Sequence, residues 1–519
     1  MTAAAAAQPK PTTGPRWWRD RRHLPWWRIP LYPTVFPCAM VILIWSHAAV
    51  PPSQVVRPLL ITFVAMLALT FVLAFLFADR ERAGITASAV ALFLLSLDDR
   101  VGLLLGVVIV ALLVEGIVHR GRRAIVAGIA TRVLNVVAAI LAIAVAIAVA
   151  GTGAPQHWFA SATKPGLPPI GTAAPGSPDV YVILLDAYPG DRAAALSRTF
   201  DRDAFPKALT ARGFDVVRDS HSNYLMTQLT LTSMLSMRHL VDIPALDPPY
   251  GSREDDWWRV RDVLDDPPAF AEFRAAGYTT TAVDSGFAHV QLPRVDHFVA
   301  QPGPGELEAI LIWSSRLGKI IDAVVPHARA DLARLRIEAP FRETAEIAAQ
   351  HSASPRLVFT HVPAPHPPWV FDADGSPRNP SVITFADEPQ DTDEEALDAG
   401  FGQATHVADL TTDLVDKIRA SSPTPPVIVV MSDHGPATDF PLAAPLTGAF
   451  TVRASNFMAA STPGHQDLIG DRLTPVNLFA TLLDAYVGGT RPRQANTIWG
   501  WQGSYLNAIE APPVPGWAP

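Results

Sequence analysis

The stretch Pro426-Val-Ile-Val-Val-Met-Ser-Asp-His-Gly435 decides the fold of the second part of the chain. Its five consecutive apolar residues, four of them β-branched, are typical of a strand buried on both faces. A second run of this kind, Asp179-Val-Tyr-Val-Ile-Leu-Leu-Asp186, also ends in a carboxylate. In open α/β sheets, ligands bind beyond the carboxyl ends of the strands. Asp186, Asp433 and His434 are therefore candidate ligands of one metal ion, and a capping aspartate beside an incidental histidine is the alternative for the second pair.

Strand and helix patterns alternate from residue 179 onward. The predicted strands cover residues 179–186, 213–217, 278–283, 356–361, 426–431 and 449–452. The predicted helices cover residues 191–212, 225–237, 269–276, most of 305–350, 394–419 and 474–486. This alternation predicts an α/β domain in which helices cover both faces of a mostly parallel sheet.

The first part of the chain is apolar. Its apolar segments cover residues 31–49, 59–78, 84–97, 101–118 and 133–150, and residues 59–78 carry no charge at all. Twenty such residues are enough to cross about 30 Å of hydrocarbon as a helix. The connections between successive segments are alternately rich and poor in arginine. This pattern predicts five spans with a cytoplasmic amino terminus. Three spans, with the third and fourth segments as a re-entrant pair, would leave the rest of the chain on the same side.

These patterns predict four regions in a multi-pass protein of the cell membrane. They are a cytoplasmic basic-aromatic tail (1–30), a transmembrane domain (31–150), a linker (151–178) and an extracytoplasmic domain (179–519). Residues 1–150 hold 14 Lys and Arg against 6 Asp and Glu, whereas the remainder holds 27 against 43. This acidic second part argues against nucleic acid as a partner. Glu115 and Asn135 interrupt apolar segments and belong either to a polar pathway or to helix-to-helix hydrogen bonds.

Two further motifs carry polar side chains that are suited to catalysis. Thr227 falls in the first turn of the predicted helix 225–237, where the helix dipole would stabilise an alkoxide; a role as N-cap is the alternative. His361 and His366 follow a predicted strand in a loop that prolines stiffen, Val358-Phe-Thr-His-Val-Pro-Ala-Pro-His-Pro-Pro-Trp369. Such histidines bind anions or act as acid and base, although a place in the core is the alternative for His361.

The order of these motifs resembles that of the alkaline phosphatase superfamily. An aspartate ends the first strand, a threonine opens a helix about forty residues later, and a His-Pro-Pro-aromatic loop precedes a late Ser-Asp-His-Gly. The resemblance is closest to the sulfatase-like membrane branch, the lipoteichoic acid synthases and the lipid A phosphoethanolamine transferases. Those enzymes have five spans followed by an extracytoplasmic catalytic domain. The motif order covers residues 180–490.

The resemblance implies a role for each matching residue. Thr227 would be the nucleophile, because Thr230, Ser233 and Met234 continue the family motif. His366 would bind the phosphoryl oxygens or protonate the leaving group. One divalent ion, zinc or manganese, would be held by Asp186, Thr227, Asp433 and His434. Weaker candidates for substrate contacts, with a salt bridge, a turn or the core as the alternative, are His361, Asn223, Arg453 and Asn456.

We therefore expect a membrane enzyme that transfers a phospho-alcohol group from a lipid or lipid-linked donor to an envelope glycan, lipid or polyol acceptor. Asp186 departs from the transferases, which use Glu here, and matches sulfatases and phosphatases. A hydrolase of the same fold that uses water is therefore an alternative, and a non-catalytic ectodomain that binds a partner is another. The sulfatase motif Cys-x-Pro-x-Arg is absent, and the single cysteine, Cys38, lies in the first apolar segment. This argues against a formylglycine sulfatase.

Overall fold

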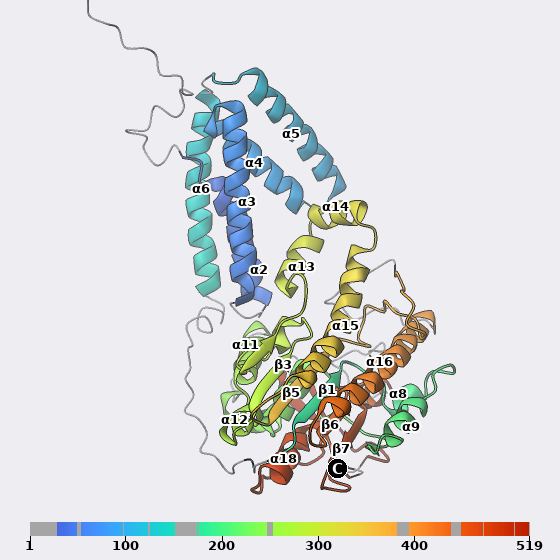
Figure 1. The fold of residues 1–519 in the computed structure, drawn as a ribbon. Coiled ribbons are helices and arrows are strands. Elements are labelled where there is room, and N and C mark those ends of the chain that lie inside the picture. The colour runs from blue at the N-terminus through green and yellow to red at the C-terminus, as the bar shows by residue number, and fades with distance from the viewer. Residues whose placement is uncertain are drawn as a thin grey trace, which may run out of the picture. The chain divides into compact units, whose positions relative to one another are not determined.

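The computed structural model describes residues 29–48, 53–96, 98–122, 125–150, 173, 176–246, 253–380, 394–436, 448–470, 472–502 and 504–517. The predicted tail and most of the predicted linker lie outside these residues. The chain divides into two compact units (Figure 1). The first unit comprises residues 1–47, 52–151 and 307–320, and the second comprises 48–51, 152–306 and 321–519.

Each of the five predicted apolar segments forms a helix of the first unit. The helices are α2 (Tyr32–Ala48), α3 (Ser53–Phe77), α4 (Arg80–Leu95), α5 (Asp99–Val118) and α6 (Ile125–Ala150). Within the described residues, α3 (from Gln54), α5 and α6 are long and apolar enough to cross a membrane, and α2 and α4 are shorter. Large apolar side chains cover the outside of these helices; Leu103, for example, is 74% exposed. Such a surface is suited to lipid rather than water. The number of spans stays a prediction.

Hydrogen bonds join polar residues of these helices to one another. Asp79 accepts from the backbone N–H groups of Glu81 and Arg82 and so caps α4. The Arg82 guanidinium donates to Glu115 at 2.8 Å, and the Asn135 amide bonds backbone groups just before α2. Glu115 therefore makes a hydrogen bond between two helices, which is one of the two alternatives considered for it, whereas Asn135 bonds the backbone that precedes α2.

The second unit is built on a seven-stranded sheet of order β2-β7-β6-β1-β5-β3-β4. Strands β6, β1, β5, β3 and β4 are parallel, whereas β7 runs antiparallel to both β6 and β2. The predicted fold class, a helical apolar part followed by an α/β domain with a mostly parallel sheet, is confirmed. The strand bounds are β1 (Val180–Leu185), β2 (Asp215–Val217), β3 (Thr279–Val283), β4 (His297–Val299), β5 (Arg356–Val362), β6 (Val427–Met431) and β7 (Met458–Ser461).

Helices cover both faces of this sheet because side chains along each buried strand alternate between two cores. Val180, Val182 and Leu184 of β1 face a core that contains residues of α10 (Thr227–Ser236), α12 (Pro268–Ala275) and α18 (Pro475–Tyr486). Their neighbours Tyr181, Ile183 and Leu185 face a core built with α9 (Ala204–Thr210), α15 (Ala328–Ala349) and α16 (Glu394–Ser421). The remaining elements are α8 (Asp191–Ala194), α11 (Arg253–Asp265), α13 (Glu306–Trp313), α14 (Arg316–Val324), α17 (Gly448–Ala454), the 3-10 turns η2 (Leu240–Asp242), η3 (Pro244–Leu246) and η4 (Ala288–Val290), and the hairpin strands β8 (Trp499–Gln502) and β9 (Ser504–Glu510).

Two predicted elements differ from the structure. Residues 449–452, predicted as a strand, belong to helix α17, and the strand that follows is β7. A short apolar run does not distinguish a strand from a buried helix, which explains the error. The predicted helix 191–212 is broken into α8 and α9. Between them the Ser197 hydroxyl accepts from two backbone N–H groups and the Asp201 carboxylate accepts from a third, which competes with helix formation.

Candidate active site

Two adjacent parallel strands bring three ligand groups together at the carboxyl edge of the sheet. Asp186 directly follows β1, and Asp433 and His434 follow β6 one residue after its end. Strands β1 and β6 pair in register, with Leu184 opposite Met431. One ligand atom from each of the three residues lies within 4.8 Å of the others, and all three residues are buried. The structure therefore brings the predicted Asp, Asp and His together.

The tautomer of His434 follows from its partners. Its Nδ1 lies 2.9 Å from the carbonyl oxygen of Gly435, which only accepts, so Nδ1 carries the proton. Nε2 then presents a lone pair, 3.1 Å from Asp433 Oδ2 and 3.2 Å from the Thr227 hydroxyl. A histidine whose other nitrogen is fixed by a carbonyl is the usual arrangement of a metal ligand. Gly435 permits this turn, since a Cβ there would overlap the carbonyl oxygen of Val452.

The two carboxylates each have one satisfied oxygen and one without a partner. Asp433 Oδ1 accepts from the backbone N–H of Ala187 at 3.0 Å, and Asp186 Oδ2 accepts from His361 Nε2 at 3.1 Å. Asp186 Oδ1 and Asp433 Oδ2 are buried, and no described residue forms a hydrogen bond with either oxygen. Buried acceptors without a donor lower the stability of the folded protein unless a nearby group or ion supplies positive charge. The residues present therefore fit a divalent cation.

Burial raises the pKa of Asp433, whereas nearby histidines hold the pKa of Asp186 below its ordinary value despite its burial. For Asp433, burial and then the charge of Asp186 raise the pKa to about 6. Burial also pushes the pKa of Asp186 upward, but His366, His361 and His434 outweigh it and hold that pKa below its ordinary value. Two carboxylates so close together and away from water are both stable as anions only beside added positive charge.

Thr227 stands beside this cluster as the first residue of α10. The N-cap of that helix is Met226, without a side-chain cap, so the alternative role of Thr227 as N-cap is wrong. Its hydroxyl faces His434 instead, at the positive end of the helix dipole. Thr227 is therefore placed where a developing oxyanion is stabilised both by the helix and by any cation held by the three ligands.

The two histidines of the proline loop differ in exposure. His361 lies in β5, is 3% exposed, and donates to Asp186. His366 is half-buried; its Nδ1 donates to the carbonyl oxygen of Pro367 at 2.8 Å, and its backbone N–H donates to the carbonyl oxygen of Asp186 at 3.0 Å. The Phe287 ring packs against both imidazoles. Neutral His366 thus presents a lone pair at Nε2, and the doubly protonated ring donates there.

A small cavity of about 30 Å³ opens beside His366. Its walls combine apolar rings with one guanidinium, that of Arg453. Arg453 also donates to the carbonyl oxygens of Leu225 and Gly435 and lies 3.4 Å from His434 Nε2, so it fastens the start of α10 to the Asp-His turn. The lining includes Ala187, His366, Pro367, Trp369, Phe401 and Arg453.

The side chains of the other two predicted substrate contacts, Asn223 and Asn456, form hydrogen bonds within the protein. Asn223 donates to the carbonyl oxygen of Thr497 at 3.0 Å and accepts from Val476 N at 3.0 Å. Asn456 accepts from the Ser220 hydroxyl at 2.8 Å and donates to the carbonyl oxygen of Ser432 at 2.9 Å. Both side chains are 1% exposed. This geometry supports the alternative, a structural role, for both.

Two buried polar residues near these elements were not predicted. Asp284 directly follows β3 at the same sheet edge and accepts from Gln291 at 2.7 Å; burial raises its pKa. The rule that selected Asp186, a carboxylate after a buried strand, also selects Asp284. Gln228 follows Thr227, is 1% exposed, and neither atom of its amide has a hydrogen-bond partner. No pattern in the sequence marks it.

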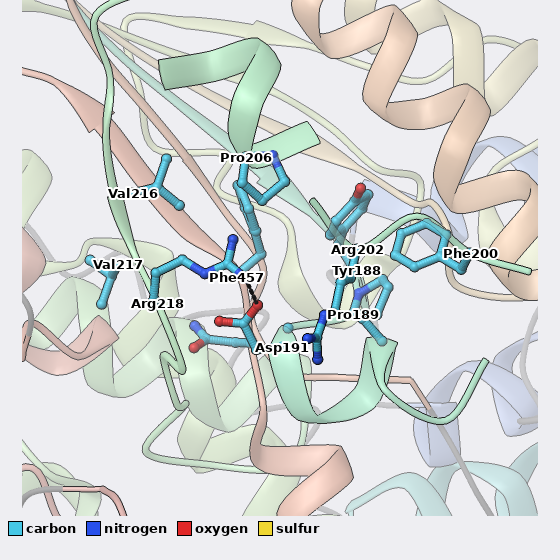
Figure 2. Close-up of a pocket in the computed structure, with 13 residues that line it drawn as sticks. Tyr188, Pro189, Asp191, Phe200, Arg202, Pro206, Val216, Val217, Arg218 and Phe457 are labelled. Carbon is cyan, nitrogen blue, oxygen red and sulfur yellow. Dashed lines mark ion pairs between the residues drawn. The ribbon is translucent and has the colours of Figure 1, made fainter. Parts of the chain in front are cut away.

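Figure 2 shows a second cavity, whose lining residues include Asn456. Asp191 and Arg218 form an ion pair of 2.8 Å at its wall, and the rings of Tyr188 and Phe457 line it. Its volume is only about 10 Å³, which is room for one water molecule. We therefore assign no ligand to it.

Comparisons with known proteins bear on the fold. No protein-family model matches the sequence, and no curated protein matches it. Among solved structures, the chain is similar to the C-terminal periplasmic domain of EptC from Escherichia coli in complex with zinc. The identity is 13% and the TM-score 0.42, over 67% of this chain and 98% of that chain.

Two further structures extend this likeness. The integral membrane lipooligosaccharide phosphoethanolamine transferase EptA from Neisseria meningitidis matches at 13% identity and a TM-score of 0.38, over 88% of this chain and 97% of that chain. The lipoteichoic acid synthase LtaP from Listeria monocytogenes matches at 12% identity and a TM-score of 0.35, over 64% and 76%. The matched proteins are of the kinds that the motif order resembles, and at these identities the likeness concerns the fold.

Proposed function

We propose that this chain is a membrane-bound enzyme that transfers a phospho-alcohol group from a lipid donor to an envelope glycan, lipid or polyol acceptor, with Thr227 as nucleophile. One observation carries the proposal: the Thr227 hydroxyl lies 3.2 Å from His434 Nε2, beside two buried carboxylates that each have an orphaned oxygen. An apolar helical unit in the same chain supports a lipid donor, because it keeps the enzyme at the surface where such donors are found.

Asp186, Asp433 and His434 would hold one divalent cation, with the Thr227 oxygen as a further ligand. Carboxylate, hydroxyl and imidazole donors suit zinc or manganese. A cation bound there would supply positive charge that lowers the pKa of a neighbouring hydroxyl and stabilises phosphoryl oxygens.

The residues of the chain account for the rest of the reaction. The Thr227 hydroxyl loses its proton to solvent, and Oγ1 forms a bond to phosphorus as the bond from phosphorus to the lipid alcohol breaks, which leaves the phospho-alcohol group on Thr227 as a phosphodiester. His366, doubly protonated, donates the Nε2 proton to the departing alcohol. The hydroxyl oxygen of the acceptor then attacks phosphorus while neutral His366 accepts its proton at Nε2, and the bond from phosphorus to Thr227 Oγ1 breaks, after which Oγ1 regains a proton from solvent. The apolar rings of Trp369 and Phe401 beside His366 keep water away from this intermediate.

The proposal places the second unit outside the cell, with the amino terminus in the cytoplasm. The arginine pattern between the helices supports this orientation. Contacts within the first unit support it too. Glu308 pairs with Arg57 near the start of α3, and Arg316 and Lys319 contact the turn between α4 and α5. The pattern predicts both of these helix ends on the outer side.

Hydrolysis by the same residues is the second candidate, and Asp186 favours it because the transferases that the chain resembles have glutamate there. Product analysis with and without an added acceptor alcohol separates the two reactions. Transfer gives a phosphodiester of the added alcohol, whereas hydrolysis gives the free phospho-alcohol in both cases.

The test of the proposal uses the full chain in lipid nanodiscs with zinc or manganese and a panel of phospholipid donors. Mass spectrometry of the donor products and of the peptide that contains Thr227 should find turnover and a phospho-alcohol adduct. Thr227→Ala should abolish both, whereas Thr232→Ala, one turn along the same helix, should keep them. Full activity of Thr227→Ala would refute the nucleophile, and purified protein that retains no metal would favour a binding ectodomain.

A further inference from the structure

Helix α14 carries an apolar stripe that the described residues leave largely exposed. Leu317, Ile320, Ile321 and Val324 recur at intervals of three, one and three residues, which places them on one face of a helix. Leu317 is 41% exposed, Ile320 is 44% exposed and Val324 is 74% exposed. A face this apolar is expected to be buried against something other than water.

Residues at the start of this helix form hydrogen bonds and an ion pair with the apolar helices of the first unit. The Arg316 guanidinium donates to the Ser96 hydroxyl at 3.0 Å and to the carbonyl oxygen of Asp98 at 2.6 Å, and Lys319 pairs with Asp99 at 2.9 Å. Ser96, Asp98 and Asp99 lie between and at the facing ends of α4 and α5. Residues 307–320 accordingly cluster with the first unit, although they lie more than 150 residues beyond the last of its other helices.

The contact between α14 and α5 is close. A Cβ at Gly102 of α5 would overlap the Arg316 guanidinium, and the same guanidinium lies 5.3 Å from the centre of the Phe93 ring of α4. On these two helices Leu92 is 55% exposed and Leu103 is 74% exposed. The apolar stripe of α14 therefore begins beside side chains that face lipid in a bilayer.

We infer that α14 lies in the interface of the membrane that the first unit spans, with Leu317, Ile320 and Val324 at the boundary between head groups and acyl chains. Amphipathic helices bind in this way with the apolar face about 5–10 Å deep. Arg316 and Lys319 lie off the apolar stripe, at the level where cations meet lipid phosphates. This inference goes beyond the proposed reaction and does not depend on it.

A second copy of the chain is less suited than a membrane surface to cover the apolar face of α14. Stable protein interfaces bury about 800 Å² on each partner, which is far more than three or four aliphatic side chains provide. A membrane surface has no such requirement, because apolar side chains partition into it one by one.

The test measures lipid contact at single cysteines. Cys38→Ser gives a cysteine-free chain, in which Leu317→Cys, Ile320→Cys and Val324→Cys are each labelled with a small fluorophore. Ala323→Cys, which is exposed on the same helix but off the stripe, is the matched control. Each protein is placed in nanodiscs that carry nitroxide lipids, with the nitroxide either at the head group or at a shallow acyl position.

Membrane binding predicts a blue-shifted fluorophore and stronger quenching by the shallow acyl nitroxide at positions 317, 320 and 324 than at 323. Equal, weak quenching at all four positions would overturn the inference, since it would place the stripe in water. Shielding that persists in lipid-free amphipol and rises with protein concentration would assign the face to a second copy and would also overturn it. None of these readings requires enzyme activity, so they stand whether or not the proposed reaction is correct.

Discussion

The backbone N–H of Ala187 donates to Asp433 Oδ1 at 3.0 Å, across 246 residues of sequence. Ala187 follows Asp186 directly and has a φ of 61°, in the left-handed region that alanine seldom adopts. This conformation turns the N–H away from the strand direction and toward the carboxylate that follows β6. One backbone group thus fixes the spacing between Asp186 and Asp433, the two acidic candidate ligands, at a conformational cost of about 1–2 kcal/mol.

Substitutions at Ala187 should separate backbone conformation from chemistry. Glycine adopts a positive φ freely, so Ala187→Gly should leave stability within about 1 kcal/mol of wild type and keep the metal. Ala187→Val places a β-branched residue in the left-handed region and should lower both stability and metal content. Thermal unfolding and elemental analysis of the purified proteins measure the two effects. Equal metal content in the valine and glycine variants would contradict the role assigned to this turn.

Asp433→Asn should have opposite effects with and without metal. Removal of one of two buried carboxylates relieves their repulsion, so the variant should melt at a higher temperature than wild type in a chelator. Added zinc or manganese should stabilise wild type, by about 2.7 kcal/mol at a hundred times its Kd, and should hardly stabilise the variant. Asp416→Asn, which removes an exposed carboxylate paired with Arg212, is the control and should respond to metal as wild type does. A metal response of Asp433→Asn equal to that of wild type would rule out the ligand assignment.

Asn223→Ala should reduce stability and leave the KM for the donor unchanged. The substitution removes two hydrogen bonds and leaves Val476 N, at the start of α18, and the carbonyl oxygen of Thr497 without partners. Buried groups left unpaired cost about 1–3 kcal/mol each. Urea denaturation together with steady-state kinetics distinguishes this from a substrate contact, for which the KM would rise at unchanged stability.

Buried histidines should make the second unit less stable as the pH falls below neutrality. Burial lowers the pKa of His221, against the hydrogen bond to the carbonyl oxygen of Asn496 and the charge of Asp219, and Arg192 lowers it further. The unfolded chain, with a histidine pKa near 6.5, binds more protons than the folded chain below that pH, so the free energy of unfolding rises with pH. The stabilisation is complete above about pH 6.5 and is lost as the pH falls toward the lowered pKa.

The free energy of unfolding should therefore fall from pH 8 to pH 5, with a slope of up to about 1.4 kcal/mol per pH unit for each such histidine. The melting temperature, measured over the same pH range, should fall with it. His221→Phe keeps an aromatic ring against Trp517, on which His221 stacks at 4.8 Å, and removes the titrating group. The slope should be smaller in this variant. A steeper slope would mean that His221 is charged in the folded protein.

The meeting of the three candidate metal ligands at one sheet edge could be predicted from the sequence because few geometric facts determine it. Two buried parallel strands that end in acidic residues must present those residues at one edge of a sheet, whatever the loops do. Asp186, Asp433 and His434 satisfy that rule on local sequence alone. Asn223 and Asn456 obey no such rule, because their partners are backbone groups of Val476 and Ser432, set by tertiary packing.

Short helices and strands were the other features that could not be predicted reliably from the sequence. Residues 449–452 and 458–461 are both short and partly apolar, and only their packing decides that the first is α17 and the second is β7. The apolar stripe of α14 is visible in the sequence as the spacing of Leu317, Ile320 and Val324. Its attachment to the turn between α4 and α5, however, depends on ion pairs across 220 residues, which no local pattern encodes.

The distance along the chain between Asp186 and Asp433 sets the order of events during biosynthesis. A ribosome that has made β1 and every helix up to α16 has still produced no pair of ligands from adjacent strands. The cation would therefore be acquired last, after β6 has docked beside β1, and a prematurely terminated product would carry none. Incorporation of the ion would then report that synthesis and pairing of the central strands were complete.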